Sequence, residues 1–436
     1  MDRYNERPSE KPSFDLNHEG QRLVGDWYAS LQEVHEAKEP VAYILVMENA
    51  VDILRSFDFR FVFPEINSFQ TPAREMPENY GISPDVCSYV KADVGLLLKE
   101  LQRPIGRAPK PDIVVASNMC DPFVRWAEIW KRCLGTQTFV LDLPGQHGAR
   151  WKVRVSEKKH VSDSRWIEAQ LRQLIGFCEA ITGKRFSLDR LAEIEENVNE
   201  MIRLWVEIMA LNQKSPALFN AMLDGLTYVG VMNVCRGTTE GVEYMRRLYA
   251  DLSLKAARGE GRLSKERFRL VYSGTPCYVS MRGLVEQFEA WNAVFAYSDY
   301  LTFAAGGLDA AGVLYDTSRP LESLAEMTAL ASYRSLSHEF FSRRRLMQKI
   351  QEYDADGLIF HGIRSCPFAS TAMLDTGDFI SKRFGIPALY IESDLIDGRY
   401  GPDGRIKDRV DDFFEALQER SRIGAKAVGD EGVSQK

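Results

Sequence analysis

Two stretches of the chain alternate short apolar runs with amphipathic segments. In the first stretch the runs fall at residues 41–47, 60–68, 111–118 and 136–144, and in the second at 268–274, 293–300, 356–362 and 387–394. Continuous apolar runs of this length are typical of parallel strands that are buried on both faces. Because segments with helical periodicity separate them, the pattern predicts an α/β protein with doubly wound parallel sheets.

The region between these two stretches has a helical pattern. Its segments "RWIEAQLRQLIGFCEAITG" and "LDRLAEIEENVNEMIRLWVEIMALN" carry apolar residues at three- and four-residue spacing, which predicts amphipathic helices. The chain should therefore form two doubly wound lobes with a helical segment between them and a cleft where the lobes meet. The expected division is a loose N-terminal arm at 1–20, a first lobe at 21–160, a helical segment at 161–265, a second lobe at 266–420 and a disordered tail at 421–436.

The composition describes a globular protein with more than one domain. The chain has 436 residues, of which 45% are hydrophobic and 27% charged, and this length exceeds what one ordinary core supports. The net charge of −7 argues against a nucleic-acid-binding protein, which needs a basic face. The sequence shows neither a signal-peptide pattern nor an apolar run of membrane-spanning length, so we expect a cytoplasmic protein without membrane segments.

The cysteines carry the most specific chemical signal. There are seven, an odd number, and no C-x-x-C pair occurs, so disulfides and the usual zinc-ribbon spacing explain them poorly. Cys87, Cys120 and Cys366 each lie where a helix is expected to begin, in "SPDVC", "ASNMCDP" and "IRSCP". We expect Ser83 to cap the helix that contains Cys87. A helix start favours the thiolate form that binds metal, and its free N–H groups can donate to an iron–sulfur cluster.

A packing role is the main alternative for each cysteine. A cysteine considered singly is more often a small core residue than a ligand, and Cys133, Cys178 and Cys235 lie in apolar stretches that fit this interpretation. Cys277 follows a predicted strand and is a rival as a fourth ligand. The residues alone therefore leave open a metal site or a non-catalytic scaffold whose cysteines only pack. A zinc hydrolase is less favoured, because the six histidines are scattered along the chain.

The ordered set of motifs "SPDVCSYVK", "ASNMCD" and "HGIRSCPF" resembles the three cysteine motifs of the benzoyl-CoA reductase and 2-hydroxyacyl-CoA dehydratase subunits. The segments "ITGKRFSLDRLAEIEENVNEMIRLW" and "RFGIPALYIESDLIDGRYG" resemble the helical section and the C-terminal end of the same family. The likeness extends from about Val41 to Leu417. Among the members, the length and the Cys120 segment are most similar to the larger cluster-bearing subunit of the ATP-dependent benzoyl-CoA reductases.

The resemblance implies that Cys87, Cys120 and Cys366 hold one [4Fe–4S] cluster in the cleft, with one iron left without a cysteine. It also implies two partners, namely a related smaller cluster-bearing subunit and an ATP-hydrolysing iron–sulfur activator that supplies electrons. The absence of a G-x-x-x-x-G-K-[ST] motif in this chain agrees with ATP binding elsewhere. The implied reaction is reduction of the ring of benzoyl-CoA to a cyclic dienoyl-CoA. The alternative within the family is dehydration of a 2-hydroxyacyl-CoA through a ketyl radical.

Two further residues are candidates for proton transfer. Glu65, in "FVFPEINS", follows a predicted strand and could face the cleft as a proton donor or acceptor. His361, in "GLIFHG", precedes the Cys366 loop and could donate a proton or a hydrogen bond to the cluster. The alternatives are a helix cap or solvated carboxylate for Glu65 and a structural hydrogen bond for His361.

Overall fold

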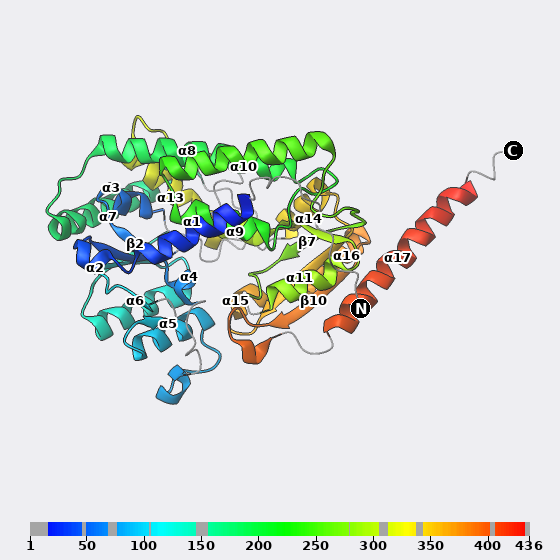
Figure 1. Ribbon diagram of the computed structural model, residues 1–436, viewed down its shortest axis with the longest axis horizontal. Helices are drawn as coiled ribbons and strands as arrows, with labels where there is room; N and C mark the ends of the chain where they lie inside the picture. Colours follow the sequence, from blue (N-terminus) through cyan, green and yellow to red (C-terminus); the bar gives the residue numbers. More distant parts are fainter. Residues whose placement is uncertain are drawn as a thin grey trace, which may run out of the picture.

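Figure 1 shows a computed structural model of the 436-residue chain. The structure describes residues 16–45, 49–68, 76–103, 106–144, 156–278, 280–304, 313–336, 343–401 and 406–431. The first 15 residues of the predicted N-terminal arm and residues 432–436 of the predicted tail lie outside this set.

The first lobe contains a parallel sheet in which strands pair in the order β2-β1-β5-β6. The strands are β1 (Val41–Ile44), β2 (Arg60–Val62), β5 (Ile113–Ser117) and β6 (Gln137–Leu141). All residues of β1 and β5 are buried, as the continuous apolar runs predict. The helices of this lobe are α2 (Val34–Ala37), α3 (Val51–Ser56), α4 (Pro64–Ser68), η1 (Met76–Tyr80), α5 (Ser88–Leu98) and α6 (Asp121–Leu134).

The second lobe contains another parallel sheet, with strands in the order β10-β9-β7-β8. Its strands are β7 (Phe268–Ser273), β8 (Ala293–Ser298), β9 (Gly357–Ile363) and β10 (Ala388–Ser393). Its helices are α11 (Met281–Glu289), α12 (Asp299–Ala304), α13 (Pro320–Leu336), α14 (Arg343–Glu352), α15 (Pro367–Ser370), α16 (Met373–Phe384), η3 (Gly398–Tyr400) and α17 (Ile406–Glu431). The prediction of two parallel α/β lobes is confirmed.

Both sheets have the same strand order. In each lobe the first strand lies between the second and the third, and the fourth pairs with the third at the edge of the sheet. Successive strands are therefore added first on one side and then on the other side of β1 in one sheet, and of β7 in the other. Ligands of open α/β sheets bind outside the carboxyl ends of the strands, at the point where the strand order reverses in this way.

The helical segment covers the lobes rather than merely joining them. It consists of α7 (Glu157–Thr182), α8 (Leu188–Leu211), α9 (Asp224–Val234) and α10 (Thr239–Arg258). Helices α8 and α10 run side by side along the top of Figure 1, and α13 packs against α7 and α8 although it belongs to the second stretch of the sequence. Sequence periodicity alone does not predict this long-range packing.

The two ends of the chain are more helical than predicted. Helix α1 (Leu16–Ser30) begins inside the range assigned to a loose arm, because its apolar face packs against α9 and the Tyr244 hydroxyl donates to the carbonyl of Leu16. Helix α17 continues to Glu431, into the range assigned to a disordered tail. Alanine, lysine and arginine favour a helix there, and no proline interrupts it. The run at 60–68 also differs, because β2 ends at Val62 and Pro64 then opens α4.

A small antiparallel hairpin, β3 (Gln102–Arg103) and β4 (Gly106–Arg107), was not predicted. In the described part of the chain, no helix combines the length and the apolar character that crossing a membrane requires.

Glu195 on α8 is a buried acid. Its side chain is fully buried, and neither carboxylate oxygen has a hydrogen-bond partner among the residues that the structure describes. Burial raises the pKa of Glu195 to about 9, with a smaller contribution from the nearby charge of Asp52. The side chain is therefore protonated at neutral pH.

The buried acid predicts a pH-dependent stability. Because the folded pKa of Glu195 lies above the unfolded value, unfolding releases this proton between about pH 5 and pH 8. Its contribution to stability should fall by about 1.4 kcal/mol per pH unit in that window. Glu195→Gln should remove this slope, so that the variant gains stability over the wild type as the pH rises. Urea unfolding at pH 5 and pH 8 measures the effect, and parallel pH profiles for both proteins would contradict it.

Candidate functional site

All three candidate cysteines occupy the position immediately before a helix. Cys87 precedes α5, Cys120 precedes α6 and Cys366 precedes α15, and each is half-buried. Helices α6 and α15 begin as predicted, each with a proline in the first turn. Helix α5 begins later than predicted, at Ser88. Ser83 forms a local turn instead, in which its hydroxyl accepts from the Asp85 N–H at 3.3 Å.

The loops that carry Cys87 and Cys366 meet across the two lobes. The N–H of Ser88 donates to the hydroxyl oxygen of Ser365 at 3.3 Å, and the two hydroxyl oxygens are 3.4 Å apart. These serines are the immediate neighbours of the two cysteines. The Cys366 thiol is close enough to act on the pKa of Cys87. Cys87 and Cys366, which are 279 positions apart in the sequence, therefore share one site.

Backbone N–H groups point at both sulfur atoms. The N–H groups of Val90 and Tyr89 donate to the Cys87 sulfur, and the N–H of Ala369 donates to the Cys366 sulfur. Burial nevertheless raises the pKa of Cys87 to about 12 and also raises that of Cys366. The N–H groups at the helix starts lower the pKa of these thiols, as predicted, but desolvation has the larger effect and raises the pKa overall. Metal binding would displace the thiol protons.

A buried carboxylate braces the helices that carry Cys87 and Cys120. Asp93, on α5, accepts hydrogen bonds from the indole N–H groups of Trp126 and Trp130 on α6, both at 2.7 Å. Asp93 and both tryptophans are 1% exposed. Asp93 lies six residues after Cys87, and Trp126 lies six residues after Cys120. The brace fixes the two helices relative to each other from inside the core.

The donor set partly fits the cluster that the resemblance implies. Within the described ranges, no three His, Cys, Asp or Glu side chains converge in the way that the ligands of a single metal ion do. Thiolates of a [4Fe–4S] cluster bind different irons and are spaced more widely than that. Cys87 and Cys366, with N–H donors at their sulfurs, suit such a group. That Cys120 joins them remains a prediction, supported by the Asp93 brace.

A buried ion network attaches the Cys87 segment to the second lobe. The ammonium of Lys91, 1% exposed, donates to the Pro84 carbonyl at 2.7 Å and lies 3.3 Å from both Glu78 and Asp397. Arg399 contacts the same two carboxylates, at 2.5 Å from Glu78 and 2.6 Å from Asp397. Residues 78–91 of the first lobe are thus tied to residues 397–399 of the second lobe.

Removing the central cation of this network should destabilise the protein. Lys91→Met keeps an apolar stem of similar length but leaves the Pro84 carbonyl and Asp397 with less compensation, so we expect a loss of about 2–4 kcal/mol. Urea unfolding measures the loss. The matched control is Lys407→Met, because Lys407 forms an exposed ion pair with Asp411 and should change stability by less than about 0.5 kcal/mol. Equal losses of stability for the two substitutions would show that the buried network stabilises the fold no more than an exposed ion pair does.

Glu65 lies at the boundary between the lobes. It sits on α4 directly after β2, is 5% exposed, and its carboxylate is close enough to act on the pKa values of Tyr28 and Tyr300. Tyr300 belongs to α12 of the second lobe. This position suits a proton donor or acceptor in the cleft, which remains a prediction for Glu65. A fully solvated loop carboxylate does not fit its burial.

His361 is held between strands of the second sheet. It is fully buried, and its ring nitrogens contact the Thr275 carbonyl at 2.5 Å and the Ser393 hydroxyl at 2.6 Å. Burial lowers the pKa of His361 to about 4, so the ring is neutral at pH 7. Because both ring nitrogens are engaged with neighbouring groups of the second lobe, this geometry favours a structural hydrogen bond, the alternative to proton donation. Proton donation by His361 stays a prediction.

Of the three cysteines predicted to pack in the core, Cys178 and Cys235 are buried as expected. Cys277, the rival fourth ligand, is buried with its sulfur 3.0 Å from the Ser280 hydroxyl, and its role as a ligand stays a prediction. Cys133 is exposed, so its assignment to the core is wrong. In the last turn of α6 the neighbouring Leu134 packs on the core instead.

Three tyrosines beside the cysteines were missed by the sequence interpretation. The hydroxyl groups of Tyr89, Tyr278 and Tyr300 lie close enough together to act on one another's pKa, and the ring centroids of Tyr278 and Tyr300 are 6.2 Å apart. Tyr89 is a residue whose N–H donates to Cys87, and Tyr89, Tyr278 and Cys366 pack on one apolar cluster. The only local signal is that each tyrosine closely follows a cysteine or a strand end, which is too common to single them out.

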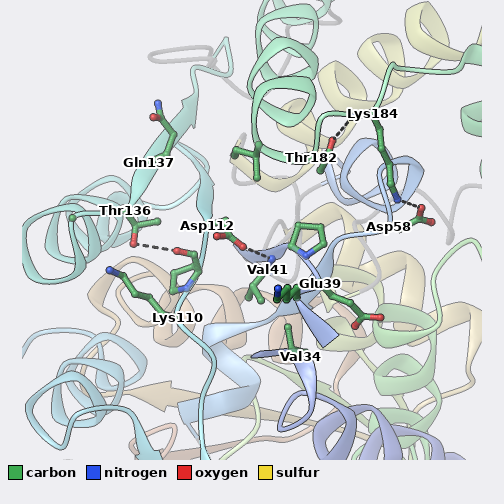
Figure 2. Close-up of a pocket in the computed structure, with 15 residues that line it drawn as sticks. Val34, Glu39, Val41, Asp58, Lys110, Asp112, Thr136, Gln137, Thr182 and Lys184 are labelled. Atoms are coloured by element: carbon green, nitrogen blue, oxygen red, sulfur yellow. Dashed lines mark hydrogen bonds and ion pairs between the residues drawn. The ribbon is translucent and has the colours of Figure 1, made fainter. Parts of the chain in front are cut away.

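A cavity of about 890 Å³ lies away from this site. Figure 2 shows it at the amino ends of the first sheet, around Val41, Asp112 and Gln137. Polar groups in it are engaged with one another, as in the 2.5 Å pair of Lys184 with Asp58 and the 2.8 Å bond from the Val41 N–H to Asp112. The cysteine loops follow strands β5 and β9 at the opposite, carboxyl ends, so we do not assign the chemistry to this cavity.

Known proteins share this sequence pattern over most of the chain. Residues 51–417 match the family described as "2-hydroxyglutaryl-CoA dehydratase, D-component". The chain is 31% identical over 423 residues to a benzoyl-CoA reductase subunit of Thauera aromatica, covering 92% of this chain and 94% of that protein. It is 24% identical over 419 residues to the (R)-2-hydroxyisocaproyl-CoA dehydratase alpha subunit of Clostridioides difficile, covering 92% and 96%. The chain therefore belongs to the 2-hydroxyglutaryl-CoA dehydratase D-component family, as its cysteine motifs predict.

Proposed function

We propose that this chain is the larger iron–sulfur subunit of an ATP-dependent benzoyl-CoA reductase. The observation that carries the proposal is the meeting of the Cys87 and Cys366 loops across the lobes, joined by the contact between Ser88 and Ser365. The similarity to the Thauera aromatica benzoyl-CoA reductase subunit, 31% identical over 92% of this chain, supports this choice of substrate. A cytoplasmic location is part of the same proposal.

Cys87, Cys120 and Cys366 would hold a [4Fe–4S] cluster, which supplies one-electron chemistry when bound. The chain's own groups would do the rest. The N–H groups of Val90 and Ala369, among others, stabilise negative charge at the sulfurs. Glu65, buried beside the lobe boundary, would hold or move a proton for the reduction.

The proposed partners follow from the same assignment. Electrons would come from an iron–sulfur activator that hydrolyses ATP. We assign ATP binding to that partner because this sequence lacks the Gly-rich phosphate-binding motif G-x-x-x-x-G-K-[ST]. A related smaller cluster-bearing subunit would complete the complex. Two relatives that are named as subunits, of a benzoyl-CoA reductase and of a 2-hydroxyisocaproyl-CoA dehydratase, support a hetero-oligomer.

The dehydratase relatives support a second candidate, dehydration of a 2-hydroxyacyl-CoA. The test is to purify the complex without oxygen and to supply ATP and a reductant with either benzoyl-CoA or an (R)-2-hydroxyacyl-CoA. We expect ATP-dependent formation of a cyclic dienoyl-CoA from benzoyl-CoA. Formation of an enoyl-CoA from the hydroxyacyl substrate, without ring reduction, would replace the reductase by the dehydratase. If an anaerobically reconstituted complex contained no iron, the chain would be assigned the non-catalytic scaffold role instead.

A further inference from the structure

A second cavity, of about 750 Å³, lies where the two lobes and the helical segment meet. It is bounded by α1 and α9, which pack side by side, by Ile66 of α4 and by residues of α11 and α12. Most of its exposed lining is apolar. The apolar lining residues include Val24, Ile66, Leu223, Leu226, Val229 and Met281.

The inner wall of this cavity adjoins the cysteine loops. Tyr278 and Tyr300 line it, and both lie close enough to Tyr89 to act on the pKa of its hydroxyl group. Tyr89 in turn donates its N–H to Cys87 and packs beside Cys366. A layer of phenol groups therefore lies between the cavity and the two sulfurs.

Two glycines keep the cavity open. Gly25 of α1 and Gly230 of α9 both line it. A methyl group added at Gly25 would meet no atom within 4 Å, and one at Gly230 would meet only a methyl of Val24 at 3.3 Å. A larger side chain at Gly25 would thus reach into empty space, without a clash at its first carbon. Arg282, exposed at the same cavity, supplies a positive charge on the solvent side.

We propose that this cavity binds the acyl group of a CoA thioester and that the phenol groups of Tyr278 and Tyr300 donate hydrogen bonds to the thioester carbonyl. An apolar cavity with a few convergent donors suits an aromatic or aliphatic acyl group, and the exposed Arg282 suits the anionic CoA portion. The inference rests on the proposed acyl-CoA chemistry, but it does not depend on which acyl-CoA is the substrate.

The first test is equilibrium binding of benzoyl-CoA to the purified complex, measured by calorimetry without ATP or reductant. Gly25→Leu should weaken binding at least about tenfold, because the new side chain occupies the space of the acyl group. Gly176→Leu is the matched control, since Gly176 is also a helical glycine whose added methyl group would meet nothing within 4 Å, but on α7. The control should bind as the wild type does. Equal affinities of all three proteins would overturn the proposal.

The second test isolates the phenols. Tyr300→Phe removes one hydroxyl and keeps the ring, and we expect it to weaken benzoyl-CoA binding about three- to tenfold. Binding of the thioether S-benzyl-CoA, which lacks the carbonyl, should not change in Tyr300→Phe. An equal loss for both ligands would contradict a hydrogen bond to the carbonyl.

The outcomes separate this inference from the proposed function. If Gly25→Leu binds and reduces benzoyl-CoA normally, the cavity assignment is wrong while the reductase assignment stands. If the wild-type complex binds only a 2-hydroxyacyl-CoA and Gly25→Leu abolishes that binding, the reductase assignment is wrong while the cavity assignment stands.

Discussion

Cys366→Ala should abolish both the iron content and the ring-reducing activity of the reconstituted complex. Cys366 shares one site with Cys87 across the lobes, and the N–H of Ala369 already points at its sulfur. Removal of one of three thiolates leaves the proposed cluster with too few ligands to persist. We expect iron bound to this chain to fall to near the background level, with the same result for Cys87→Ala and Cys120→Ala. Iron analysis after anaerobic reconstitution measures this directly.

The remaining cysteines provide internal controls for this experiment. Cys133 is exposed on α6 and lies outside the shared loops, so Cys133→Ala should keep full iron and activity. Cys178 is buried in the core, so Cys178→Ala should keep its iron but lose about 1 kcal/mol of stability. Full iron in the Cys366 variant, measured beside these controls, would overturn the assignment. A loss of iron only in Cys120→Ala would place the metal elsewhere on the first lobe.

Asp93→Ala should produce a large loss of folding stability, about 3 kcal/mol or more. The substitution leaves the indole N–H groups of Trp126 and Trp130 buried without this acceptor. It also releases α5 from α6, so the iron content should fall together with stability. Urea unfolding and anaerobic iron analysis measure the two effects.

Two variants separate the brace from charge as such. Asp93→Asn keeps an oxygen that can accept both indole bonds, so it should retain most of the stability and the iron. Burial raises the pKa of Asp93 to about 7, so the wild type should lose stability as the pH rises from about 4 to 7, whereas Asp93→Asn should not. Asp26→Ala is a surface control, because Asp26 forms an exposed pair with Arg22 on α1 and its loss should cost less than about 1 kcal/mol. A loss of stability in Asp93→Ala no larger than in Asp26→Ala would show that the brace is unimportant.

The helix ends at the site illustrate how far local sequence reaches. Pro122 and Pro367 fix the starts of α6 and α15, because a proline is favoured in the first turn and excluded from later ones. Ser83 and Pro84 give the same local signal, yet α5 begins at Ser88. The Pro84 carbonyl is held by the ammonium of Lys91, which also contacts the second lobe. A long-range contact thus decides where that helix begins.

Local patterns in the chain were enough to predict the strands of both sheets, the positions of Cys120 and Cys366 at helix starts, and the family. These features depend on apolar runs, turn residues and ordered motifs whose members lie within a few residues of one another. The folded arrangement was needed to learn that the Cys87 loop docks on the Cys366 loop, that burial keeps their thiols protonated, and that three tyrosines separate them from a cavity. Desolvation and side-chain contact depend on which distant segments pack together, and such packing leaves no periodic trace along the chain.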